Sequence, residues 1–211
     1  MLDHSTLFVF IAAAVLLLVT PGPAVLYIVA RSIDQGRRAG IVSALGIHIG
    51  TLMHVAAAAL GVSALLVSSA LAFNLVKYLG AAYLIYLGLQ RLLTPEEKVQ
   101  VKPPPPQKLS RIFYQGVLVN LLNPKTALFF FAFLPQFVDV TQGNVASQVF
   151  FLGSIFIGLG VLSDGLYAIL AGTAGHWLRG NLHFLRTQRY FTAGVFITLG
   201  LTAALSGSKQ K

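Results

Sequence analysis

The sequence predicts an all-α membrane protein with six transmembrane helices. Of its 211 residues, 56% are hydrophobic and only 10% are charged, whereas a soluble domain usually has about 25% charged residues. The apolar residues also gather into long runs, and roughly 20 such residues can cross a bilayer as a helix. We expect one helix from each of six runs, which cover residues 6–30, 40–67, 73–93, 112–138, 145–175 and 190–206.

The first run, residues 6–30, is interrupted near its middle by Thr-Pro-Gly-Pro at 20–23. Proline has no amide hydrogen, so the carbonyls of Leu17 and Val19 lose their helical partners. The residues before this run contain no basic cluster. We therefore expect a retained helix rather than a cleaved signal peptide.

The second run carries two histidines, His48 and His54, and a Gly46-xxx-Gly50 pattern. Small residues four positions apart predict a close crossing with another helix. The histidines are six residues apart and lie on different faces of a helix, whereas metal ligands usually stand three or four apart. We expect histidines that are hydrogen-bonded inside the bundle, with a proton-relay role for His54 as the alternative.

The third run is followed by a polar stretch, residues 94–111, that includes four consecutive prolines. Such prolines favour an extended, solvated conformation, so we expect a cytoplasmic spacer; a ligand for a proline-binding domain is the alternative. The spacer separates two halves, residues 1–93 and 112–211, of three helices each. Because three is odd, a duplicated half would enter the membrane from the opposite side, which makes an inverted repeat.

The last helices of the two halves match best. When they are aligned, small and branched residues fall on one another at the same spacing. The aligned pairs are Ala81 with Ala193, Ile85 with Ile197, and Gly88 with Gly200.

The fourth run, residues 112–138, contains the most polar interruption, Asn120-Leu121-Leu122-Asn123-Pro124-Lys125. Pro124 removes the helical partner of the Asn120 carbonyl. Amides and an ammonium are costly in hydrocarbon, so Lys125 should face the bundle interior or a wet cavity.

Both interruptions are expected near the middle of the bilayer. Pro21 stands 10 residues before Arg31, and Asn123 stands 12 residues after Arg111. At 1.5 Å per residue, both breaks are roughly 15–18 Å deep. Two interrupted helices in corresponding positions predict a transporter's binding site, and packing kinks are the alternative. We therefore expect the breaks to converge, with an acid and an amine beside them.

The fifth run supplies the acid. Asp164 is the carboxylate that lies inside a predicted helix, 15 residues before Arg179. An ionisable residue at this depth is a functional candidate. Two alternatives stay open: Asp164 couples transport to protons, or it pairs permanently with Lys125. The sixth run, residues 190–206, is short but within the roughly 17–25 residues that can span.

Loop charges predict the orientation. Most of the 15 lysines and arginines stand after the first, third and fifth runs, so these loops should face the cytoplasm and both termini should lie outside. The net charge of +9 does not indicate nucleic-acid binding, because the basic residues alternate with apolar runs instead of lining one face.

Several chemistries are excluded. The sequence has no cysteine, which excludes disulfides and thiolate metal sites. It shows no activated nucleophile and no His-x-x-x-His pair, so we expect no enzyme, no metal and no cofactor.

Several of these motifs together resemble the lysine exporter / homoserine-threonine resistance family, over nearly the whole chain. The family often has Asn after Pro-Gly-Pro, where this chain has Ala24. The resemblance implies efflux of amino acids or their derivatives across the bacterial inner membrane, driven by the proton gradient. The motifs are Thr20-Pro21-Gly22-Pro23-Ala24, Gly46-xxx-Gly50, the stretches at 78–88 and 116–125, and Asp164.

These inferences predict a secondary active exporter that works by proton antiport with alternating access. A passive channel for small neutral solutes is the alternative, and a homodimer stays open. Proton coupling is expected from Asp164, with His54 as a second candidate. The expected substrate-binding residues are Pro21, Gly22, Pro23, Tyr27, Asn120, Asn123, Pro124 and Lys125.

Overall fold

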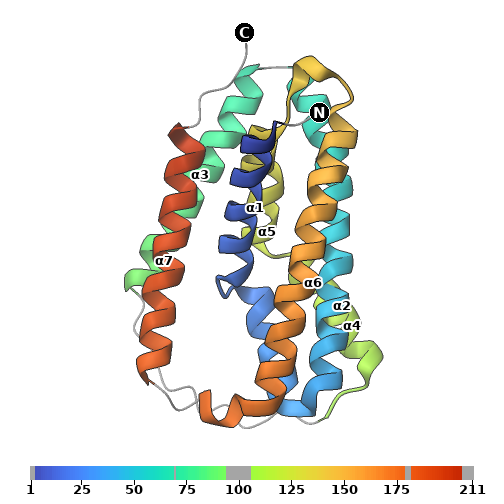
Figure 1. The fold of residues 1–211 in the computed structure, drawn as a ribbon, viewed down its shortest axis with the longest axis vertical. Helices are drawn as coiled ribbons and strands as arrows, with labels where there is room; N and C mark the ends of the chain where they lie inside the picture. The colour runs from blue at the N-terminus through green and yellow to red at the C-terminus, as the bar shows by residue number, and fades with distance from the viewer. Residues whose placement is uncertain (1–2, 69, 94–105, 179–181, 206–211) are drawn as a thin grey trace.

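Every regular element in the described part of the chain is helical, which confirms the prediction of an all-α protein. The computed structural model describes residues 3–68, 70–93, 106–178 and 182–205. The helices run mostly along one long axis, and α1 begins at the same end of the molecule at which α7 ends (Figure 1). Most of the predicted spacer, residues 94–105, lies outside the described residues.

The chain leaves helical geometry at the first proline cluster. Helix α1 spans His4–Val19, and α2 spans Pro23–Ser68. The axis of α1 and that of the first part of α2, Pro23–Gln35, are bent by 47°. A second change of direction follows at Gly36, whose φ of 82° lies in the left-handed region that favours glycine. There α2 turns back toward the opposite end of the molecule (Figure 1).

The second interruption has the same form. Helix α4 spans Leu109–Leu121, and α5 begins at Pro124 after a two-residue gap and ends at Leu128. The chain continues as the π-helix η1, Phe129–Phe133, and the 3₁₀ helix η2, Leu134–Phe137. The bend between α4 and this continuation is 48°. A further 3₁₀ turn, η3 (Val140–Gln142), leads into α6, which spans Val145–Leu178.

Helices α3 (Ala70–Leu93) and α7 (Leu182–Leu205) pack on each other through the residues that the sequence aligns. The space around their glycines, expressed as the contacts that an added Cβ would make, shows how closely the two helices approach. At Gly88 it would lie 2.6 Å from Ile197 and 3.0 Å from the Ala193 carbonyl oxygen. At Gly200 it would lie 2.7 Å from Ile85 and 2.8 Å from the carbonyl oxygen of Ala81, the residue aligned with Ala193. The two helices therefore exchange equivalent contacts.

Helix α2 crosses α4 where the glycine pattern predicted a close approach. A Cβ at Gly46 would overlap the Phe113 carbonyl, and one at Gly50 would lie 2.9 Å from the Val117 carbonyl oxygen. Neither position tolerates a larger side chain without moving α4.

Two helices in the described part of the chain are long and apolar enough to cross a membrane alone. They are Arg37–Gly61 and Val145–Thr173, and up to four spans result if each bent pair counts as one. The segments expected to span at 73–93 and 190–206 are helical, as α3 and α7, but are not among these four. The count of six spans therefore stays a prediction.

The apolar exterior agrees with a membrane location. Large apolar side chains are widely exposed, including Leu60 at 77% and Leu162 at 72%. Soluble monomers rarely expose apolar surface on this scale. The interior holds a cluster of buried aromatic rings from α1, the second broken segment and α6: Phe10, Phe129, Phe130, Phe133, Phe137 and Phe156.

Candidate functional site

The two broken segments meet inside the bundle. The Lys125 ammonium, from the first turn of α5, donates a 2.5 Å hydrogen bond to the Thr20 carbonyl at the end of α1. A Cβ at Gly22 would lie 3.0 Å from Lys125 Cδ. A larger residue at position 22 would therefore require the lysine side chain to shift by a few tenths of an ångström.

The carbonyls freed by the prolines all have partners. Leu17 accepts a 3.2 Å bond from the amide at the end of its own helix. The Val19 carbonyl accepts from the Tyr167 hydroxyl at 2.7 Å, and that of Asn120 accepts from His54 Nε2 at 3.0 Å. Protein donors therefore occupy the freed carbonyls in this conformation.

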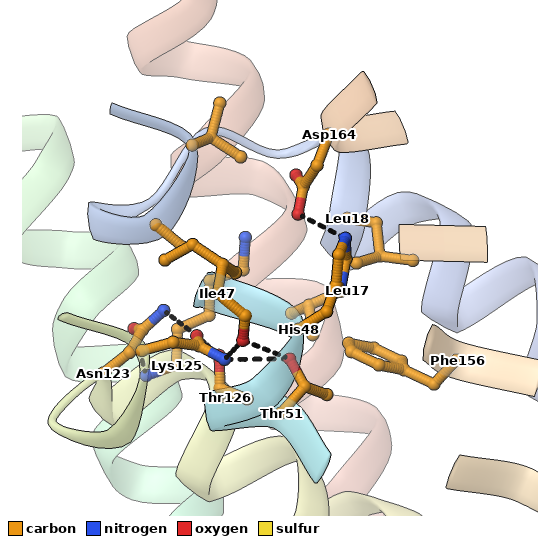
Figure 2. Close-up of a pocket in the computed structure, with 13 residues that line it drawn as sticks. Leu17, Leu18, Ile47, His48, Thr51, Asn123, Lys125, Thr126, Phe156 and Asp164 are labelled. Carbon is orange, nitrogen blue, oxygen red and sulfur yellow. Dashed lines mark hydrogen bonds and ion pairs between the residues drawn. The ribbon is translucent and has the colours of Figure 1, made fainter. Parts of the chain in front are cut away.

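A cavity lies where the breaks meet, lined by 13 residues of α1, α2, α4, α5 and α6 (Figure 2). Its polar lining comes from the second broken segment, from the later part of α2 and from α6, whereas the first broken segment contributes apolar residues. These polar residues are His48, Thr51, Asn120, Asn123, Lys125, Thr126 and Asp164.

Both asparagines of the second break are engaged in holding that break. The Asn120 amide donates to the Ile47 carbonyl and to the Thr51 hydroxyl, each at 2.8 Å. Its oxygen accepts from the Thr126 hydroxyl at 3.0 Å. Asn123 is the N-cap of α5, since its side chain accepts from the backbone amide of Lys125 at 3.1 Å. These bonds explain how a polar break is tolerated inside the bundle.

The acid and the amine both border the cavity and are both buried. Lys125 is 7% exposed and Asp164 is 4% exposed. Among the described residues, no ion pair joins them. The Asp164 carboxylate instead lies 3.5 Å from His48 Nε2. The alternative of a permanent Asp164–Lys125 pair is therefore not seen in this conformation.

Other predicted site residues lie beside the cavity without lining it. Pro21, Pro23 and Pro124 shape the two breaks. Tyr27 points its hydroxyl at the Ile112 carbonyl of α4, at 2.9 Å. His54 stacks on the ring of a buried phenylalanine and bonds to the second break.

Sequence reasoning missed His48, Thr51 and Thr126 as lining residues. A signal for the first two was present, because His48 and Thr51 stand three apart and share one helix face. The sequence analysis instead offered His54 as the candidate proton relay. Which histidine faces α6 depends on the rotation of α2, and the sequence does not give that rotation.

Comparison with known proteins finds one matching family and several relatives that cover most of the chain. The family described as LysE type translocator matches residues 15–207. A Bacillus subtilis protein described as an uncharacterized membrane protein is 30% identical over 96% of this chain and 100% of its own length. A homoserine/homoserine lactone efflux protein of Salmonella typhimurium is 30% identical, over 93% of this chain and 95% of its own length. A leucine efflux protein of Salmonella choleraesuis is 32% identical over 69% of both chains. No solved structure matches.

Proposed function

This chain belongs to the LysE type translocator family, and from this premise we propose that it is a secondary active exporter of amino acids or their derivatives, by proton antiport with alternating access. The relatives described as efflux proteins for homoserine, homoserine lactone and leucine support the substrate class. The observation that carries the mechanism is the meeting of two broken helices at a cavity bordered by Lys125 and Asp164.

The proposed architecture is a pair of inverted three-helix repeats, residues 1–93 and 112–211, joined by a cytoplasmic linker at 94–111. The nearly equal bends of 47° and 48° support it. The exchange of equivalent contacts between α3 and α7 supports it as well, because a two-fold axis between these helices would produce that exchange. The protein would then cross the bacterial inner membrane six times, with both termini outside.

Substrate recognition would use the two charges of a zwitterion. A carboxylate would bind the Lys125 ammonium and the N-terminus of the helix that starts at Pro23, where Ala24 and Val25 line the cavity. The ammonium group would bind the Asp164 carboxylate. Lys125 would exchange its bond with the Thr20 carbonyl for one with the substrate, so binding would loosen the contact between the two breaks.

The remaining lining favours an uncharged side chain. Apart from the charged and polar groups that would hold the backbone of an amino acid, the cavity is walled by apolar side chains. A second substrate charge in this wall would have no partner, which is costly in a buried site. The apolar lining residues with large side chains are Leu17, Leu18, Val25, Ile47 and Phe156.

Proton coupling would follow from competition at Asp164. A protonated carboxyl group holds an ammonium weakly, so protons arriving from outside would release the substrate there. Rocking of the two repeats about the cavity would then expose the site alternately to each side. A passive channel would need no titrating group, and two buried charges at the break disfavour it.

An efflux screen tests the proposal. Cells expressing the chain would be loaded with labelled leucine, homoserine, lysine or glutamate, with and without a proton uncoupler. We expect uncoupler-sensitive export, greatest for the uncharged compounds. Counterflow in proteoliposomes separates a carrier from a channel, since a channel cannot drive uphill exchange. Uncoupler-insensitive flux without counterflow would contradict the proposal.

A further inference from the structure

The imidazole of His48 is an ionisable group, 11% exposed, that this mechanism leaves unused. It lines the cavity from α2, and its Nε2 lies 3.5 Å from Asp164 Oδ2 on α6. Figure 2 shows the two side chains facing each other. Nε2 is shielded from solvent and makes no hydrogen bond within the described part of the chain. This separation exceeds the length of a hydrogen bond, about 2.7–3.2 Å, so the two side chains are neighbours that are not hydrogen-bonded to each other.

The other ionisable groups of this region are engaged elsewhere. The Lys125 ammonium, from α5, and the Tyr167 hydroxyl, one turn beyond Asp164 on α6, donate to backbone carbonyls of the first break. His54, further along α2, donates to the second break. Among the described residues, His48 is therefore the ionisable side chain within ion-pair distance of Asp164.

The space for the His48 ring depends on a glycine. Gly160 stands one helical turn before Asp164 and so lies on the same face of α6. A Cβ at Gly160 would come 3.0 Å from His48 Cε1, closer than ordinary van der Waals contact. Leu18 of α1 lies beside the same spot, 3.5 Å from that Cβ position. The His48 ring therefore fits against α6 because position 160 carries no side chain.

We infer that His48 and Asp164 form one proton-binding pair, in which a proton on His48 and the ammonium of the substrate compete for the same carboxylate. This inference rests on the proposed function and adds a second coupling residue to it. When the imidazole is protonated and Asp164 is ionised, the pair has no net charge. When the substrate ammonium takes the place of the imidazolium beside the Asp164 carboxylate, His48 Nε2 releases its proton to water on the open side. One positive charge replaces another, so the total charge of the ammonium, His48 and Asp164 is again zero.

Shared titration follows from this arrangement. Two ionisable groups in contact bind protons as a pair rather than separately. Imidazole is the side chain whose unperturbed titration falls near neutral pH. The protonation state of His48 then decides whether Asp164 is available to a substrate, so substrate exchange across the membrane becomes proton exchange.

The test compares two transport modes in proteoliposomes with labelled leucine as the probe. One mode is export driven by an imposed pH gradient, and the other is counterflow at equal pH. We expect His48→Gln to lower gradient-driven export about tenfold more than it lowers counterflow, within the usual range of coupling effects. His54→Gln is the matched control on the same helix. It should lower both modes by the same factor, because His54 supports the second break instead of facing Asp164.

A proton measurement adds a readout that a structural role would not change. Leucine binding to the wild-type protein in weakly buffered detergent should release protons, and the pH profile of this release should flatten in His48→Gln. If that variant does not reach the membrane, Gly160→Ala decides, because its added methyl would lie 3.0 Å from His48 Cε1 and would require the ring beside Asp164 to shift.

The outcomes separate the two hypotheses. If His48→Gln kept the wild-type ratio of gradient-driven export to counterflow and the wild-type proton release, the proposed His48–Asp164 pair would be overturned. If only Asp164→Asn lost coupling, the antiport proposal would still stand. A wild-type protein that shows neither counterflow nor gradient-driven transport for any compound of the efflux screen would instead remove the proposed function itself.

Discussion

At the scale of single residues, Lys125 shows how a charge is kept inside the bundle. Its ammonium is 7% exposed and donates to one backbone carbonyl, that of Thr20. In the proposed mechanism this ammonium exchanges its bond with the Thr20 carbonyl for one with the substrate carboxylate. The sequence placed a cation at this depth, but the carbonyl that holds it could not be deduced, because it lies 105 residues away in the chain.

Replacing Lys125 with methionine should weaken substrate binding while preserving packing of the aliphatic chain. A hydrogen bond to a charged group contributes roughly 1.5–3 kcal/mol, so we expect KM for leucine to rise roughly 10- to 100-fold. Lys108→Met is the matched control, since Lys108 is exposed before the start of α4. An unchanged KM in Lys125→Met would show that the carboxylate binds elsewhere.

Asp164→Asn should uncouple export from the pH gradient. The amide keeps the size of the side chain but cannot titrate, so acidifying the outside should no longer accelerate leucine export in vesicles. Asp139→Asn is the control, because hydrogen bonds from the Thr141 hydroxyl and amide hold the pKa of Asp139 below its usual value. Asp139 therefore stays charged at neutral pH and cannot carry the pH response. Normal uphill export by Asp164→Asn would count against the coupling role.

At the scale of helices, local chemistry predicted the breaks, and tertiary packing decided what surrounds them. Prolines at 21, 23 and 124 end helical hydrogen bonding wherever the chain folds. The groups that replace those bonds come from distant helices, as with Tyr167 on the Val19 carbonyl. The turn at Gly36 was expected only as a loop between two runs. One residue with positive φ suffices there, which apolar patterning does not reveal.

The contact between α3 and α7 gives a prediction for paired substitutions. Gly88→Ala and Gly200→Ala should destabilise the protein by similar amounts, because each new methyl would come within 3.0 Å of an isoleucine and a backbone carbonyl of the facing helix. Overpacking costs about 1–3 kcal/mol, which outweighs the gain of roughly 1 kcal/mol from replacing a helical glycine.

Thermal unfolding in detergent, followed by loss of the monodisperse peak, measures the effect. Gly194→Ala is the control in α7, because nothing lies within 4 Å of its Cβ position, and it should raise Tm slightly. A lower Tm in only one of the two packed variants would argue against equivalent roles for α3 and α7.

At the scale of the whole molecule, the proposed orientation has a direct chemical test, because the chain has no cysteine and any introduced thiol is unique. Lys108 precedes α4 and Ser147 lies in the first turn of α6, and both are exposed. One broken span, α4 with its continuation through α5 to η2, connects them, so they should lie on opposite sides of the membrane.

In spheroplasts, a membrane-impermeant maleimide should label Ser147→Cys at once and Lys108→Cys only after permeabilisation. The basic loops would then face the cytoplasm, as the positive-inside rule requires. Labelling in the reverse order would show that the protein has the opposite orientation. The side from which protons are proposed to reach the cavity would then not be the side on which substrate is released.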